Sequence, residues 1–390
     1  MRAVTVVRQD LLVPGDPFVA DLDPLRFDGL LPAVWAMNST ADVNALVGLL
    51  RDLTPTDGFV AGLSPQACAA TMRDLGILLG SLRRHGVQPT RVVPQLGSVL
   101  LELGARTGMV PRDTVQHYIG WNPTGSRERM YTGDRQERML MASVRVTLPR
   151  LVFAVEECRR FDELDPHQPD FAMAAHEVVA LIRSLEDAID IVLANVTPEF
   201  FARTLRPYFE AVTVDGAEYL GPAAAHAPLY LVDLALWASD HGGETDAGLW
   251  RESARYGLPQ WQLLYQRWAR CPSVVTRVTS ALVPPHGSPP SPQVRAAAEA
   301  VSRALRALLV FRGKHSAVAR DTYAEEIRLQ PLGSGGGSLE LLDRLATLTR
   351  ENATRVRQST VRSREVRTSP GPAASADDGS PLTARERRTS

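Results

Sequence analysis

The chain has 390 residues and a formal net charge of −1 at pH 7, from 43 basic and 44 acidic side chains. This length suffices for one large or two modest domains, and the balanced charge gives no electrostatic reason to expect nucleic acid or an anionic membrane as a partner. Cys68, Cys158 and Cys271 lie far apart in the sequence, which excludes a recognisable zinc spacing or disulfide framework.

The N-terminal third is predicted to be helical. The first ten residues lack the apolar core of a signal peptide, and no stretch approaches the roughly 20 apolar residues that span a bilayer. We therefore expect a cytoplasmic protein. Helices are predicted over 43–53, 64–84 and 91–106, the second with Ser64 as N-cap and Pro65 at its first position. A further helix is expected to open at Pro111.

The middle of the chain continues this pattern. Residues 122–134 are rich in Pro, Gly, Thr and Arg and are predicted to be a loop, followed by long helices over 137–161 and 171–196. Residues 211–219 alternate and contain Asp215-Gly216, which indicates a β-hairpin. An all-α fold with at most this minor hairpin is therefore expected.

The C-terminal part contains the most informative helix. Ala304, Leu308, Phe311 and His315 follow the 3.6-residue period and place the histidine on the apolar face. A buried imidazole there needs a hydrogen-bond partner or a metal, and histidine is the usual proximal ligand of heme iron. Spacing alone favours a satisfied core histidine. Gly313 is unusual inside a helix and is interpreted as clearance for a bulky planar group.

Five blocks, in order from about residue 30 to 355, resemble the indoleamine/tryptophan dioxygenase superfamily, and most closely the branch typified by monodechloroaminopyrrolnitrin synthase. They are 72–86, 121–133, 205–210, 219–237 and 311–336, the last including the glycine-rich loop 333–337. The resemblance implies a helical heme-binding fold in which His315 is the proximal ligand of a b-type heme. No Cys-x-x-Cys-His occurs, so covalent attachment is not expected.

The resemblance also implies roles for other residues. Tyr323 and Ser334 would line the substrate site, although a core tyrosine and a flexible linker are the alternative readings. His117 and Trp121 are candidates for a distal pocket, with a histidine packed beside a tryptophan as an equal alternative. Neither the sequence nor the resemblance identifies catalytic residues beyond the heme. Arg145, Arg206 and Arg312 are candidate partners for heme propionates, and no spacing chooses among them.

These expectations combine into one hypothesis. The organisation is an N-terminal helical part (1–106), a helical heme-binding catalytic domain (107–356) and a disordered tail (357–390). The resemblance implies a heme-dependent oxidoreductase of bacterial secondary metabolism that takes L-tryptophan or chlorotryptophan, with O2 or peroxide, and rearranges the indole to an aminophenylpyrrole. Cleavage of the indole ring as in tryptophan 2,3-dioxygenase, and a heme sensor without turnover, remain alternatives. The oligomeric state cannot be read from the sequence.

Overall fold

Helices dominate the fold. The computed structural model describes residues 12–222, 226–242, 247–283, 289–322, 324 and 338–368. Within these residues the only sheet is an antiparallel pair, β1 (Val212–Val214) and β2 (Ala217–Tyr219). Asp215 and Gly216 between the strands have φ of 48° and 76°, the left-handed conformation that a tight hairpin turn requires. The all-α expectation and the hairpin are both confirmed.

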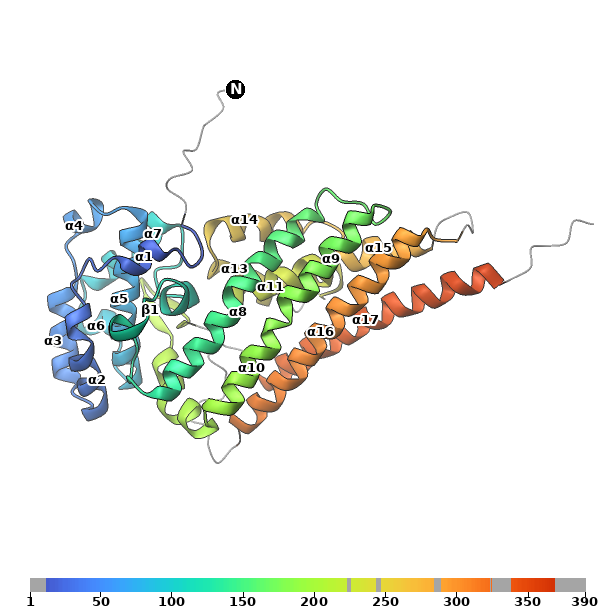
Figure 1. The fold of residues 1–390 in the computed structure, drawn as a ribbon. Coiled ribbons are helices and arrows are strands. Elements are labelled where there is room, and N and C mark those ends of the chain that lie inside the picture. The colour runs from blue at the N-terminus through green and yellow to red at the C-terminus, as the bar shows by residue number, and fades with distance from the viewer. Residues whose placement is uncertain are drawn as a thin grey trace, which may run out of the picture.

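The helices of the N-terminal part form one end of the molecule (Figure 1). They are α1 (Pro17–Asp21), α2 (Leu31–Thr40), α3 (Val43–Leu53), α4 (Asp57–Ala61), α5 (Pro65–Arg84), α6 (Pro89–Val92) and α7 (Leu96–Thr107). Their starts follow local chemistry: the Ser64 hydroxyl accepts a hydrogen bond from the Ala67 N–H at 3.2 Å, so α5 begins where the sequence predicted. The single helix predicted over 91–106 is wrong, because the chain breaks around Pro94 between α6 and α7.

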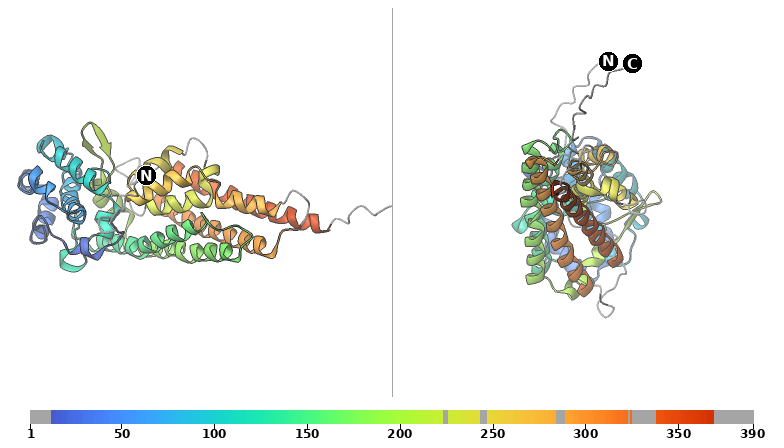
Figure 2. Two further views of the ribbon diagram at one scale, coloured as in Figure 1. Left: turned by 90° about the horizontal axis from the view of Figure 1, so that it is seen from above. Right: turned by 90° about the vertical axis from the view of Figure 1, so that its right-hand side faces the viewer.

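Longer helices lie side by side along the rest of the body, as the view from above in Figure 2 shows. They are α8 (Arg135–Arg160), α9 (Pro169–Ile182), α10 (Ser184–Asn195), α16 (Pro292–Thr322) and α17 (Leu339–Thr368). α8 packs on α9 and α10, these two pack on α16, and α16 packs on α17. The helix predicted over 171–196 is broken at Arg183 into α9 and α10.

A second group of helices packs behind this row. They are α11 (His226–Asp233), α12 (Ser239–His241), α13 (Ala247–Arg255), α14 (Pro259–Trp268) and α15 (Val274–Leu282). α11 packs on α8, and α15 packs on both α16 and α17.

Irregular helical turns connect these groups. Three are π-helical (Gln116–Gly120, Phe200–Leu205, Leu234–Ala238) and three are 3₁₀ turns (Asp28–Leu30, Gly125–Arg127, Arg206–Phe209). The helix expected to open at Pro111 is instead the π-helical turn that begins at Gln116. None of the described helices is long and apolar enough to cross a membrane.

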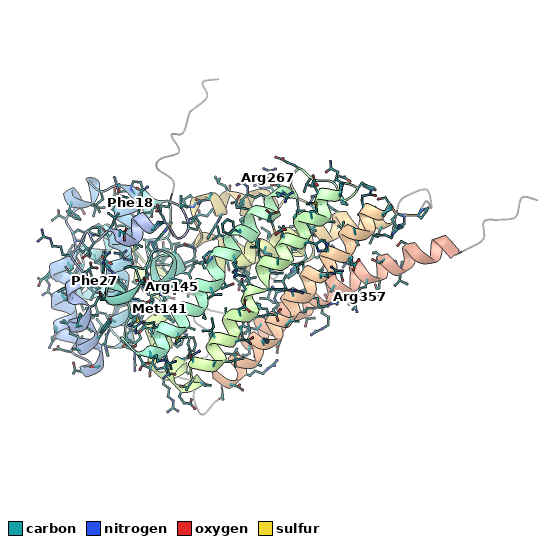
Figure 3. The ribbon with its side chains drawn as sticks, viewed as in Figure 1. Phe18, Phe27, Met141, Arg145, Arg267 and Arg357 are labelled. Atoms are coloured by element: carbon teal, nitrogen blue, oxygen red, sulfur yellow. The ribbon has the colours of Figure 1, made fainter. Side chains whose placement is uncertain are left out.

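Two hydrophobic cores fill the molecule, and α8 contributes to both. Phe27 and Met141, labelled in Figure 3, belong to the core at the N-terminal end, together with Leu148 near the middle of α8. Leu151, one turn further on, belongs to the core between the long helices. The boundary predicted after residue 106 therefore does not separate the two cores.

The C-terminal boundary also differs from expectation. α17 continues through Thr368, with Val356 almost fully buried, so the disordered tail predicted from residue 357 is wrong for residues 357–368. The prediction was wrong because the sequence after residue 356 has no clear apolar period. Arginines are frequent there, and those that the structure describes lie on the exposed faces of α17. Residues 369–390 lie outside the described residues.

Candidate functional site

A cavity of about 510 Å³ lies between the long helices. This is within the range of roughly 300–1,000 Å³ typical of cofactor and small-molecule sites. Its lining is mainly aliphatic and aromatic and comes from α8, α10, α16, the start of α17 and the π-helical turn at 116–120. Segments far apart in the sequence meet here: Phe209, Pro222 and His315 all contribute to the wall.

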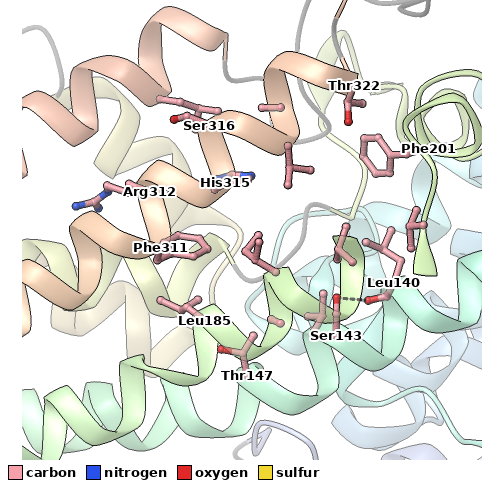
Figure 4. A pocket seen from close by; sticks show the side chains of 18 of the residues that line it. Leu140, Ser143, Thr147, Leu185, Phe201, Phe311, Arg312, His315, Ser316 and Thr322 are labelled. Carbon is pink, nitrogen blue, oxygen red and sulfur yellow. Dashed lines mark hydrogen bonds between the residues drawn. The ribbon is translucent and has the colours of Figure 1, made fainter. Parts of the chain in front are cut away.

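His315 projects from α16 at this wall (Figure 4). The predicted stripe is confirmed, since Ala304, Leu308 and Phe311 on the same face are buried. The Phe311 ring stacks on the imidazole, with centroids 5.4 Å apart and an interplanar angle of 17°. This contact fixes the plane of the imidazole.

The surroundings of the His315 imidazole favour its neutral form. Burial lowers its pKa below the ordinary 6.5, and the nearby positive charge of Arg312 lowers it further. The ring is half-buried and forms no hydrogen bond with any described residue. A neutral imidazole without a partner at a cavity wall is suited to bind a metal.

The donors around the cavity fit a metal that brings ligands of its own. No group of three His, Cys, Asp or Glu side chains among the described residues could hold a metal ion. A porphyrin supplies four nitrogen ligands, so a single imidazole completes its attachment to the protein. The single imidazole at the cavity wall therefore fits a heme.

Arg312 is the one arginine that lines the cavity within the described residues, and it is already paired. Its guanidinium contacts the Asp233 carboxylate and the Thr349 hydroxyl, and it lies 5.7 Å from the Trp237 ring centroid. Asp233 is fully buried and also accepts the Trp237 indole N–H at 3.0 Å. This pair fixes α16 to α11 and α17 beside His315.

The two other arginines considered for propionates do not line this cavity. Arg145 pairs with Glu128, and Arg206 pairs with Glu210 at 2.8 Å. The position of Gly313 also contradicts the interpretation that this glycine gives clearance for a bulky planar group. It is exposed on α16, and a Cβ added there would have no atom within 4 Å, so it gives no clearance towards the cavity.

His117 and Trp121 contact each other but do not line the cavity. The residues of this segment that do line it are Val115, Tyr118 and Ile119. The two rings form an edge contact with centroids 5.0 Å apart. Trp121 is fully buried and donates its indole N–H to the Val13 carbonyl at 2.8 Å.

The His117 ring is fully buried and accepts the Thr114 N–H at Nδ1 over 3.0 Å, while Nε2 has no partner. Burial, assisted by the charge of Arg73, lowers its pKa to about 3. Both observations suit the reading of a histidine packed beside a tryptophan.

Tyr323 and Ser334 lie outside the described residues. The residues on either side of that segment, Thr322 and Ser338, both line the cavity. Ser338 caps α17, because its hydroxyl accepts the Leu341 N–H at 3.2 Å.

The sequence prediction missed the polar residues of the opposite wall. Ser143 and Thr147 on α8 face the cavity between apolar neighbours. Their spacing of four residues on one helical face was the available signal, although hydroxyls in helices more often bond only to their own backbone.

A known protein family matches most of the chain. The family model described as monodechloroaminopyrrolnitrin synthase PrnB matches residues 25–368 of the chain. The match covers every element described here from α2 to α17, and thus the whole lining of the cavity.

Proposed function

The chain belongs to the monodechloroaminopyrrolnitrin synthase family of enzymes, and from this premise we propose that it is a heme-dependent enzyme acting on L-tryptophan or a chlorotryptophan. His315 is the observation that carries the proposal. Its imidazole has a lowered pKa, is stacked on Phe311 and has no hydrogen-bond partner among the described residues, at the wall of a cofactor-sized cavity.

In this proposal His315 is the proximal ligand of a b-type heme. The heme, when bound, supplies the redox chemistry that side chains lack. Phe311 fixes the plane of the ligand ring, and the Arg312–Asp233 pair holds the helix behind it. Burial, assisted by the positive charge of Arg312, lowers the pKa of the His315 imidazole and so favours the neutral form that binds a metal.

The remaining wall serves an indole ring. Leu185, Ile189 and Val192 on α10 are among the apolar residues that would contact its faces and keep water from it. The family resemblance suggests Tyr323 and Ser334 for the amino and carboxylate groups. The two residues that flank this segment, Thr322 and Ser338, line the cavity, which supports that placement.

The proposed reaction is the oxidative rearrangement of the indole to an aminophenylpyrrole, with O2 or peroxide as the electron acceptor. The product would retain every tryptophan carbon except the carboxyl carbon. Indole ring cleavage would instead add two oxygen atoms and keep all the carbons. Mass spectrometry of the product separates the two reactions.

Heme binding is tested by absorption spectroscopy of the purified protein. We expect a Soret band that His315→Ala abolishes or strongly shifts. His176→Ala is the matched control, because His176 is exposed on α9 and should leave the band unchanged. Full heme occupancy with an unchanged spectrum in His315→Ala would refute the assignment.

A further inference from the structure

One wall of the cavity carries hydroxyl groups on α8. Ser143 and Thr147 lie one helical turn apart and both line the cavity, although each is only 2% exposed to bulk solvent. Figure 4 shows them on α8, on the other side of the cavity from His315 on α16. A ligand beside His315 therefore has these two residues among the polar side chains of the opposite wall.

Both hydroxyls have a hydrogen-bond partner within the protein. The Ser143 hydroxyl donates to the Leu140 carbonyl over 2.7 Å. The Thr147 and Ser184 hydroxyls are 3.0 Å apart, and Ser184 donates its hydrogen to the Leu181 carbonyl at 2.7 Å. A hydroxyl has a single hydrogen, so when Ser184 gives its hydrogen to Leu181 the Thr147 hydroxyl is the donor to Ser184.

A third hydroxyl in the lining, that of Tyr118, also has its acceptor within the protein. Tyr118 donates to the Glu137 carboxylate at 2.7 Å. Burial raises the pKa of Tyr118 well above its ordinary value, so the phenol keeps its hydrogen for this bond. In this arrangement the hydroxyls of Tyr118, Ser143 and Thr147 direct their hydrogens to acceptors within the protein, and their oxygen lone pairs are left for a ligand.

This wall should therefore favour ligands that present a hydrogen-bond donor to α8 over ligands that present an acceptor. A ligand that places an N–H against α8 gains an acceptor, whereas a ligand that places a lone pair there faces other lone pairs. The gain is significant because the groups are removed from water.

We infer that Ser143 and Thr147 form the subsite that recognises the ring N–H of an indole substrate. This inference rests on the proposed function, since it assumes an indole amino acid as the ligand. It assigns the N–H contact to α8 rather than to His117, which does not line the cavity.

The test compares equilibrium binding of two ligands to the purified full-length protein. One is L-tryptophan, and the other is its benzothiophene analogue, in which sulfur replaces the ring N–H at similar size. We expect the wild type to prefer tryptophan by about tenfold, the effect of one well-placed buried hydrogen bond. Ser143→Ala and Thr147→Val should each reduce this preference severalfold, and the double variant should abolish it.

Two further variants make the test specific. Thr279→Val is the matched control: its hydroxyl donates to its own helix on α15 and is not part of the lining, so the preference should stay at the wild-type value. Ser184→Ala removes the acceptor of the Thr147 hydrogen without touching the lining. The freed hydrogen can then face the cavity, and the preference for tryptophan should fall.

The outcomes distinguish the inference from the proposed function. If both ligands bind and the double variant keeps the wild-type preference, the α8 subsite is overturned while the proposed function stands. If Ser184→Ala alone keeps that preference, the deduced polarity of Thr147 is overturned. If the wild type binds neither ligand, the proposed function fails and the inference fails with it.

Discussion

The Phe311 ring and the His315 imidazole lie nearly parallel, one turn apart on α16, with centroids separated by 5.4 Å. Such aromatic contacts contribute about 0.5–1.5 kcal/mol beyond the burial of their area. The relationship matters because His315 has no hydrogen bond with a described residue to orient it. The stacked phenyl ring is therefore the described contact that orients the imidazole.

Phe311→Leu should consequently lower the free energy of unfolding by about 1 kcal/mol and broaden the Soret band. The loss of the stacked ring lets the imidazole rotate, so bound heme should also transfer faster to apomyoglobin. Phe153→Leu is the control, because the Phe153 side chain is 63% exposed on α8 and does not line the cavity. Equal transfer rates for the two variants would contradict a positioning role for Phe311.

Replacing Gly313 with alanine should stabilise the protein. Gly313 is exposed on α16 and an added Cβ meets nothing within 4 Å, so the helix gains about 0.5–1 kcal/mol from the lower backbone entropy of the unfolded chain. Thermal unfolding measures this gain, and the heme spectrum should not change. Gly80→Ala should have the opposite effect, since its Cβ would lie 2.5 Å from the Tyr131 ring.

Acid should destabilise the fold partly through His117. Its folded pKa of about 3 lies below the ordinary 6.5, so between these pH values the unfolded chain binds a proton that the folded chain rejects. Stability due to this group is complete above pH 6.5 and falls with the pH, by about 1.4 kcal/mol per pH unit for one proton. His117→Asn keeps an acceptor for the Thr114 N–H and should show a shallower pH dependence in chemical unfolding. Parallel curves for variant and wild type would contradict this.

Asp74 lies between two buried arginines and should be intolerant of neutralisation. Its Oδ1 accepts from Arg73 and Arg129, each at 2.9 Å, and all three side chains are almost inaccessible. Asp74→Asn leaves two buried cations without this counter-charge, and we expect a loss of about 3–5 kcal/mol in the free energy of unfolding. Glu156→Gln, in an exposed pair with Arg159, should cost less than about 1 kcal/mol.

The sequence predicted those features that depend on neighbours along the chain. α3 and α5 were located by apolar spacing and, for α5, by the Ser64 cap; the β-hairpin was located by Asp215-Gly216. The His315 stripe was confirmed for the same reason, since its period is a property of one helix. The ligand role of His315 and the roles of Tyr323 and Ser334 remain predictions.

Features that depend on distant partners could not be predicted in this way. The π-helical turn at Gln116–Gly120 replaces a regular helix within tight packing, where the Gln116 side chain closely approaches Gly120. The acceptor character of Thr147 depends on Ser184, which belongs to a different helix. No local pattern of residues encodes the direction in which a hydroxyl hydrogen points.

The place where α8 passes from one core to the other has a consequence for how the molecule opens. Pro149 lies within the helix between Leu148 and Leu151, which belong to different cores, and it lacks the N–H of a regular helical hydrogen bond. Amide hydrogens on the two sides of Pro149 should therefore exchange with solvent as two cooperative blocks. Ser143 and Thr147 lie on the N-terminal side of Pro149, and the core between the long helices begins on its C-terminal side. A ligand that contacts both sides should therefore slow amide hydrogen exchange on both, so that the two blocks exchange as one.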